Sequence, residues 1–130
     1  MADDNILEVG LCGPGRHEIK NTNGDEISQF LFPAIVENPL DFENHNRVAT
    51  QFIEGVCDRE ATEVHLYCTG LTPCLTSFLN SWVNTFGLGE FFVGQQTSQT
   101  TRYAPVLYLR HHNRDTNQFE RQLFSHQGLA

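Results

Sequence analysis

The chain has 130 residues, the length of one domain, and hydrophobic residues make up 39% of it, enough for a folded core. Sixteen acidic residues against eight basic ones give a net charge of −8, which excludes a protein that coats duplex DNA nonspecifically. No apolar run approaches the roughly 18 residues of a membrane-spanning helix. The acidic residues 1–5 are unlike a secretory signal, so we expect a cytoplasmic protein.

The charge is unevenly distributed along the chain. Residues 1–63 hold thirteen acidic and four basic residues, whereas residues 64–130 hold three acidic and four basic ones. Lys20 is the sole lysine, and the other basic residues are arginines, whose planar guanidinium suits phosphate and carboxylate groups. An acidic surface over a neutral, core-forming half is the competing interpretation.

Cysteine and histidine spacing predicts neither a metal nor a cofactor. The cysteines are Cys12, Cys57, Cys68 and Cys74. They form no C-x-x-C pair and match no common zinc spacing, so we expect reduced, structural thiols. Cys74 alone stands at a predicted helix start, where a thiolate is stabilised, which leaves a thiol enzyme as a further alternative. His111 and His112 are adjacent on a predicted strand and face opposite sides, so one of them is available to a ligand but the two do not share a metal ion.

Hydrophobic patterning predicts alternating strands and helices in the first half. Residues 6–12 are predicted to form a strand that ends at a Gly-Pro-Gly turn. Residues 27–36 follow as an edge strand or an extended segment, because Pro33 interrupts them. An apolar stripe then predicts a helix over about 43–57, with Asp41 as its N-cap.

The central strand and the helix after it have the clearest pattern. Residues 64–69 are predicted to form a strand, and a helix follows over 73–86. Thr72 is the expected N-cap, and Pro73 occupies the first helical position. The helix residues expected to face the core are Leu75, Phe78, Leu79, Trp82 and Val83.

The last part of the chain predicts a loop and a hairpin. Residues 94–102 form a polar run, expected to be a mobile loop. Strands are predicted over 104–110 and 118–124, separated by a turn. The order of elements predicts a single Rossmann-like α/β domain over residues 1–130. It has a mainly parallel sheet, helices that cover the sheet faces, and a C-terminal antiparallel hairpin.

The end of the central strand is the first candidate site, because ligands of open α/β sheets bind at the carboxyl ends of strands. Free backbone N–H groups at the start of the following helix suit an anion such as phosphate. Thr69 and Thr72 would add hydroxyls, Gly70 would allow close approach of the backbone, and Pro73 removes one donor. A capped helix without a ligand is the competing interpretation.

The end of the first strand is the second candidate site. Gly13 and Gly15 would bring the backbone close to a ligand, and Arg16 and His17 would supply a guanidinium and an imidazole. The segment is neither a P-loop nor a dinucleotide-binding fingerprint, and a simple turn is the alternative. The chain has no signature of an ordinary hydrolase.

The run over residues 64–73, Val-His-Leu-Tyr-Cys-Thr-Gly-Leu-Thr-Pro, resembles the Rossmann-like CARF domains of CRISPR-associated systems and their small single-domain ring-nuclease relatives. Those domains have a strand that ends in Thr-Gly or a similar small polar turn before a helix. The resemblance implies a homodimer that binds cyclic oligoadenylate across its two-fold axis and, in some members, cleaves it without a metal. Pro73 and the absence of a lysine after the motif depart from the family pattern, which bears on cleavage more than on binding.

Two functions of different classes follow. The first is a nucleotide-binding homodimer with a possible metal-independent phosphodiesterase step, in which a ribose 2′-hydroxyl attacks in line and no protein base is required. The residues assigned to ligand binding are Gly13, Gly15, Thr69, Gly70, Leu71 and Arg102, and those assigned to cleavage are Arg16, His17 and Thr72. Residues 91–93, which are apolar, are a further reason to expect a dimer. The alternative is a non-enzymatic adaptor or inhibitor that binds a protein through its acidic half.

Overall fold

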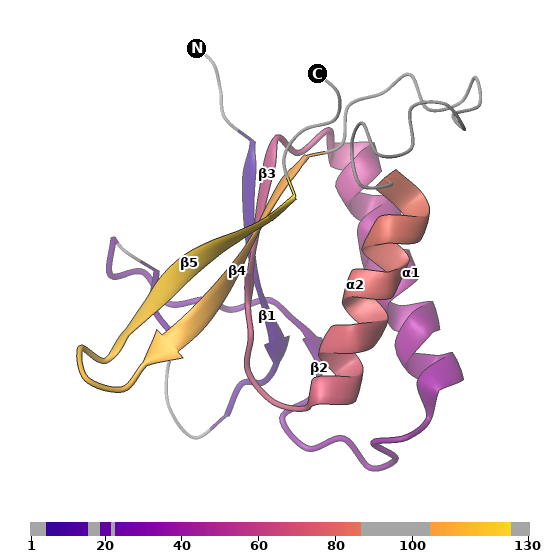
Figure 1. Ribbon diagram of the computed structural model, residues 1–130, viewed down its shortest axis with the longest axis horizontal. Helices are drawn as coiled ribbons and strands as arrows, with labels where there is room; N and C mark the ends of the chain where they lie inside the picture. The colour runs from indigo at the N-terminus through magenta and orange to yellow at the C-terminus, as the bar shows by residue number, and fades with distance from the viewer. Residues whose placement is uncertain (1–4, 16–18, 22, 87–104, 126–130) are drawn as a thin grey trace.

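A computed structural model describes residues 5–15, 19–21, 23–86 and 105–125. Its elements are β1 (Ile6–Cys12), β2 (Phe30–Phe32), α1 (Phe42–Arg59), β3 (Glu63–Tyr67), α2 (Thr72–Phe86), β4 (Val106–Asn113) and β5 (Gln118–Ser125). The strands of the described residues form one sheet in the order β2-β1-β3-β4-β5, in which only β5 is antiparallel to its neighbour (Figure 1). This is the Rossmann-like α/β fold that the alternation of elements predicts.

Both helices pack on the same face of the sheet (Figure 1), so the expectation of helices over the sheet faces holds for one face only. The physical reason is the direction of the crossovers. The chain passes from β2 to β3 and from β3 to β4 in one direction, and right-handed connections then place both helices on one side. The connection from β1 to β2 runs the other way, and its described residues form no helix. It covers the opposite face with Ile19 and Ile27, which pack near Tyr67.

The core lies between the sheet and the two helices. Alternate residues of the parallel strands point to this side, among them Val9, Val64 and Leu107. They pack against α1 and α2, where Phe78 and Trp82 are fully buried. The remaining predicted core residues of α2 are half-buried: Leu75, Leu79 and Val83. The inward-facing stripe is therefore confirmed for Phe78 and Trp82, whereas the other buried residues of α2 are the small side chains Cys74, Ser77 and Ser81.

The helix starts show one confirmed cap and one correction. Asp41 caps α1, because its Oδ1 accepts a hydrogen bond from the Asn44 N–H at 3.2 Å. In α2, the N–H groups of Cys74 and Leu75 donate to the Leu71 carbonyl, at 3.2 and 3.3 Å. Leu71 is therefore the N-cap, and Thr72 is the first residue inside the helix.

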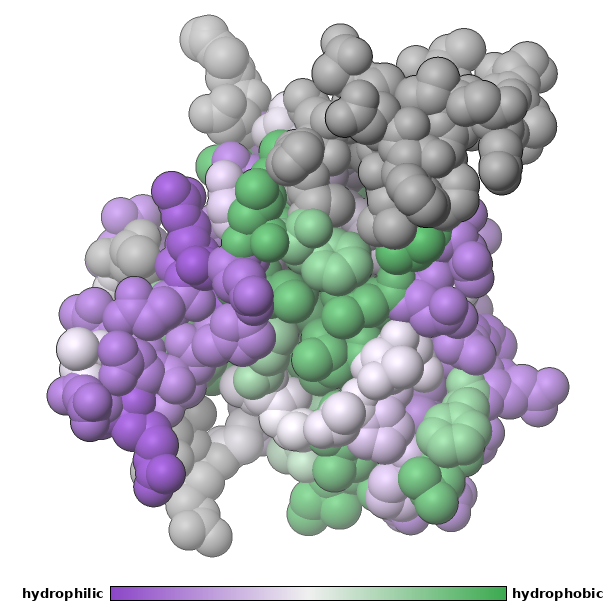
Figure 2. Space-filling view, viewed as in Figure 1, coloured by the Kyte–Doolittle hydropathy of each residue, from purple (hydrophilic) through white to green (hydrophobic). Residues whose placement is uncertain are grey.

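One flank of α2 carries a strip of hydrophobic surface. Figure 2 shows it between the polar β4–β5 hairpin and the helices. Half-buried apolar residues recur along the helix at Leu71, Leu75, Leu79 and Phe86. Within the described ranges, no helix is both long enough and apolar enough to cross a membrane.

Candidate functional site

A cleft opens where the direction of the strand order reverses. From β1 the chain moves to β2 on one side, and it then continues through β3 and β4 on the other side. The connections after β1 and β3 therefore leave a crevice at the carboxyl ends of these strands, the usual ligand position in such sheets. A cleft of about 1210 Å³ lies there, and its lining includes Cys12, Gly15, Thr69, Gly70, Arg110 and Phe119. Three of the residues assigned to ligand binding, Gly15, Thr69 and Gly70, are thus brought together.

The Thr69 hydroxyl joins the ends of β1 and β3. Its Oγ1 donates to the Cys12 carbonyl at 2.7 Å and accepts from the Cys12 N–H at 3.2 Å. A hydroxyl has one hydrogen, so the donor capacity of Thr69 is used within the protein. Thr69 therefore fixes the edge of the cleft, and it contacts a phosphate through its hydroxyl proton only if the bond to Cys12 breaks.

Gly70 is required by both conformation and packing. Its φ of +88° lies in the left-handed region that favours glycine. A Cβ added at this position would lie 2.5 Å from both Cβ and Sγ of Cys12. The sequence suggested that the backbone at Gly70 comes close to a ligand. In the structure it packs closely against Cys12 of β1. Thr72 lines a separate hollow with Leu40 and Phe42, of about 450 Å³, and is not among the residues that line the cleft.

The turn after β1 is only partly described. Gly13 is buried, its N–H donates to the Phe32 carbonyl at 3.0 Å, and an added Cβ would meet the Phe30 ring at 2.6 Å. Gly13 therefore serves the packing of β2, whereas Gly15 lines the cleft. The assigned residues Arg16, His17 and Arg102 lie outside the described residues, as do residues 91–93 and the polar run over 94–102.

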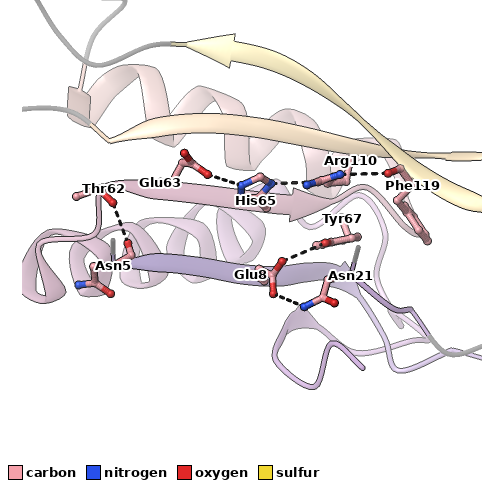
Figure 3. Close-up of polar contacts among 9 residues, drawn as sticks. All are labelled: Asn5, Glu8, Asn21, Thr62, Glu63, His65, Tyr67, Arg110 and Phe119. Atoms are coloured by element: carbon pink, nitrogen blue, oxygen red, sulfur yellow. Dashed lines mark hydrogen bonds and ion pairs between the residues drawn. The ribbon is translucent and has the colours of Figure 1, made fainter. Parts of the chain in front are cut away.

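Arg110, on β4, is the main residue that sequence reasoning missed. Its side chain is nearly buried, at 8% exposure, and it lines the cleft. Nε donates to His65 Nδ1 at 3.0 Å, and Nη1 donates to the Phe119 carbonyl at 3.2 Å (Figure 3). Among the described residues Arg110 has no carboxylate partner, and its other N–H groups form no hydrogen bond to them. These donors are available to a ligand.

A row of polar side chains leads from Arg110 along β3. His65 Nε2 lies 2.7 Å from Glu63 Oε1 (Figure 3). A guanidinium only donates hydrogen bonds, so Nδ1 of His65 must be the acceptor from Arg110. The imidazole proton is then on Nε2 and is donated to Glu63. His65 is 4% exposed, so the row runs from the partly exposed Glu63, at the amino end of β3, through a buried imidazole to the cleft.

Aromatic rings form one side of the cleft. The Tyr67 and Phe119 rings lie 5.2 Å apart between centroids, and His112 lies at the same distance from Phe119. Burial raises the pKa of Tyr67 to about 12, and the nearby Glu8 carboxylate adds to the rise. Of the two adjacent histidines, His112 lines the cleft and His111 does not.

Burial makes Cys68 and Cys74 poorly reactive thiols. Cys74 is fully buried, and burial, followed by the neighbouring Cys12, raises its pKa to about 12. Burial also raises the pKa of Cys68 to about 11. The expected stabilisation of a Cys74 thiolate at the start of α2 is therefore wrong, because loss of solvent outweighs the helix terminus. Within the described part of the chain, no group of three or more His, Cys, Asp or Glu could hold a metal ion.

No family model, curated protein or solved structure matches the chain. The cleft geometry and the resemblance of residues 64–73 therefore have to support any function. The features to be explained are a buried guanidinium with spare donors, an aromatic side wall, and a turn that requires glycine, all at the reversal of the strand order.

Proposed function

We propose that the protein binds a nucleotide-type anionic ligand in the cleft at the carboxyl ends of β1, β3 and β4. Arg110 is the observation that supports this proposal most. Burial of a cation is costly unless an anion pairs with it. Arg110 is buried, no described carboxylate pairs with it, and its side chain lines the cleft. A phosphate would supply the missing anion and accept from the guanidinium.

The rest of the cleft suits the other parts of a nucleotide. Phe119 and His112 offer ring surfaces for a nucleobase, and the side-chain amides of Asn117 and Gln118 stand beside them. The volume of about 1210 Å³ is above the range of roughly 300–1,000 Å³ that is typical of small-molecule pockets. The cleft therefore has room for a nucleotide.

The resemblance of residues 64–73 to CARF domains and ring nucleases supplies the specific form of the proposal. It favours a cyclic oligoadenylate bound by a homodimer, in which each copy contributes one cleft. The hydrophobic strip along α2 is a surface on which a second copy can pack. Metal-independent cleavage is the further step that the resemblance implies. Arg16 and His17 follow the cleft residue Gly15 in the chain and are the candidates for it, whereas Thr72 is left out by its position.

The test is binding with a matched pair of arginine variants. Thermal unfolding is followed with adenine mononucleotides, cyclic oligoadenylates and inorganic phosphate, and a ligand at one hundred times its Kd should stabilise the protein by about 2.7 kcal/mol. Arg110→Gln should abolish the shift. Arg121→Gln is the control, because Arg121 is exposed and stacks on Tyr108, with 4.8 Å between its guanidinium carbon and the ring centroid. No shift with any of these ligands, or an equal shift in Arg110→Gln, would contradict the proposal.

A protein-binding adaptor is the second candidate, and one observation favours it. Ile35, Leu40 and Phe42 are large apolar residues with exposures of 81%, 70% and 54%. Leu40 and Phe42 line the smaller hollow against α2, and acidic residues surround them in the sequence. The double variant Leu40→Ser, Phe42→Ser separates the two functions, since it should leave nucleotide binding unchanged while Arg110→Gln abolishes it.

A further inference from the structure

We propose that His65 is the positioning residue for Arg110, and that Glu63, at the far end of β3, holds His65 in the tautomer that this role requires. The inference rests on the proposed function, because it concerns how the anion-binding group of the cleft is oriented. The row contains a buried histidine and a buried arginine, each of which needs a defined partner.

The sheet register brings the row together. Glu63, His65 and Tyr67 alternate with core residues along β3, so they share the helix-free face. Tyr67 is paired with Arg110 in the adjacent strand, and His65 is paired with Tyr108. The Arg110 side chain therefore does not hydrogen-bond to its paired residue Tyr67. It extends back along the sheet to His65, two residues earlier in β3, and its Nε donates to His65 Nδ1 at 3.0 Å (Figure 3).

Two hydrogen bonds fix the guanidinium plane. Nε is held by His65, and Nη1 is held by the Phe119 carbonyl at 3.2 Å. Because the guanidinium is planar, two fixed atoms set the direction of the remaining N–H groups. Without the acceptor on His65, the group can rotate about its bond to Phe119, and its donors lose their fixed direction into the cleft.

The tautomer of His65 decides whether the first bond exists. With a proton on Nδ1, two N–H groups would face each other and the bond to Arg110 would be lost. Glu63 Oε1, 2.7 Å from Nε2, accepts a hydrogen bond from a proton on that nitrogen and so favours the tautomer in which Nδ1 is free. The carboxylate thus acts on the cleft through the imidazole, in the way that an outer partner orients a histidine that binds a metal.

The tautomer is tested directly by nitrogen-15 NMR of the histidine rings. In the wild-type protein without a ligand, we expect His65 with a free Nδ1 and a protonated Nε2. A protonated Nδ1 would overturn the inference, whatever the protein binds. Glu63→Leu should raise the population of the Nδ1–H tautomer, and an unchanged tautomer in this variant would remove Glu63 from the proposal.

The positioning role is tested by calorimetric titration with inorganic pyrophosphate and with cyclic tetraadenylate. His65→Leu should weaken binding of whichever probe binds the wild type by about tenfold, the lower end of the effect of removing an orienting partner. His65→Asn should bind close to the wild type, because its Oδ1 occupies the place of Nδ1 and can accept from Arg110. Tyr108→Phe is the control on the same sheet face, since Tyr108 is not among the residues that line the cleft.

The outcomes distinguish failure of the proposed function from failure of the positioning role alone. If neither probe binds the wild type, the proposed function fails and the positioning role fails with it. If a probe binds the wild type and His65→Leu equally well, only the positioning role is overturned. If His65→Leu does not fold, the tautomer measurement and His65→Asn decide, since a large loss in His65→Asn would contradict an acceptor role.

Discussion

Gly70 is the residue at which backbone conformation, packing and the candidate cleft coincide. Gly70→Ala places a Cβ against Cys12 at a φ where side chains are strained, so we expect a loss of about 1–3 kcal/mol in the free energy of unfolding. Urea denaturation measures it. Gly15→Ala is the control in the same cleft, because an added Cβ there meets no atom within 4 Å. Equal stability of the two variants would contradict this account of the turn.

Gly70 also bears on the proposed ligand site. Gly70→Val adds more bulk at the junction of β1 and β3, so we expect weaker binding of the nucleotide that stabilises the wild type, with both helices still formed. Calorimetry gives the affinity, and far-ultraviolet circular dichroism gives the helix content. Unchanged affinity would place the ligand elsewhere.

The thiol pKa values make a prediction about reactivity. The pKa of Cys74 is raised to about 12, so at pH 8 its thiol stays protonated and is a poor nucleophile. In the native protein, alkylation by iodoacetamide should therefore reach Cys57, which is half-buried, before Cys74. Mass spectrometry of the digested protein identifies the order, and rapid native labelling of Cys74 would contradict the burial described above.

Which site residues the sequence could predict depends on the range of the contacts involved. Thr69 and Gly70 were found because a strand, a small polar turn and a helix start are neighbours in the chain. His65 and Arg110 were not found, because they are 45 residues apart and meet only through the register of β3 and β4. One signal was available: Arg110 directly follows the apolar run over residues 106–109, inside the predicted strand.

At the scale of elements, α2 supplies Trp82, the largest fully buried side chain among the described residues. Trp82 is fully buried and contacts Phe86, with ring centroids 4.7 Å apart. Trp82→Ala should lower the free energy of unfolding by about 3–5 kcal/mol, the range for removal of a buried aromatic side chain. Denaturant titration measures the loss. A value near that of an exposed control such as Ile35→Ala would be inconsistent with the packing.

The N-cap of α1 should contribute less to the free energy of unfolding than Trp82 does, because it adds one hydrogen bond and no buried side chain. Asp41→Ala removes the acceptor for the Asn44 N–H and should cost about 1 kcal/mol. Asp41→Asn is the control, because asparagine is an equally good N-cap. Thermal unfolding of the two variants distinguishes the cap from a general effect of charge, since both substitutions remove the carboxylate.

Element types were predicted better than their placement. Periodicity indicated both helices, because the apolar stripe of each is local in sequence. It did not indicate that both lie on one face, since that depends on the order of strands in the sheet. β2 was expected only as an extended or edge segment, and it forms three residues of strand, which is too short for a clear alternation.

For the whole molecule, the proposed dimer is the main expectation. Sedimentation velocity at micromolar concentration should show a species of twice the chain mass, because the hydrophobic strip along α2 favours association and the resemblance implies a two-fold ligand site. A monomer at all accessible concentrations would remove the two-fold arrangement. It would leave the cleft within one chain as a separate question for the binding measurements.

The absence of a helix in the described part of the connection from β1 to β2 has a consequence for local unfolding. Among its described residues this connection has Ile19 and Ile27 as its buried apolar side chains, and an isolated bridge between Lys20 and Glu26 joins its two sides. A segment with so few buried contacts opens at a lower free energy than the helices on the other face. Its amide hydrogens, such as the Ile27 N–H bonded to the Ile19 carbonyl, should exchange with solvent well before those of β3. Because the same segment borders the cleft, we expect one wall of the site to unfold and refold locally while the rest of the protein stays folded.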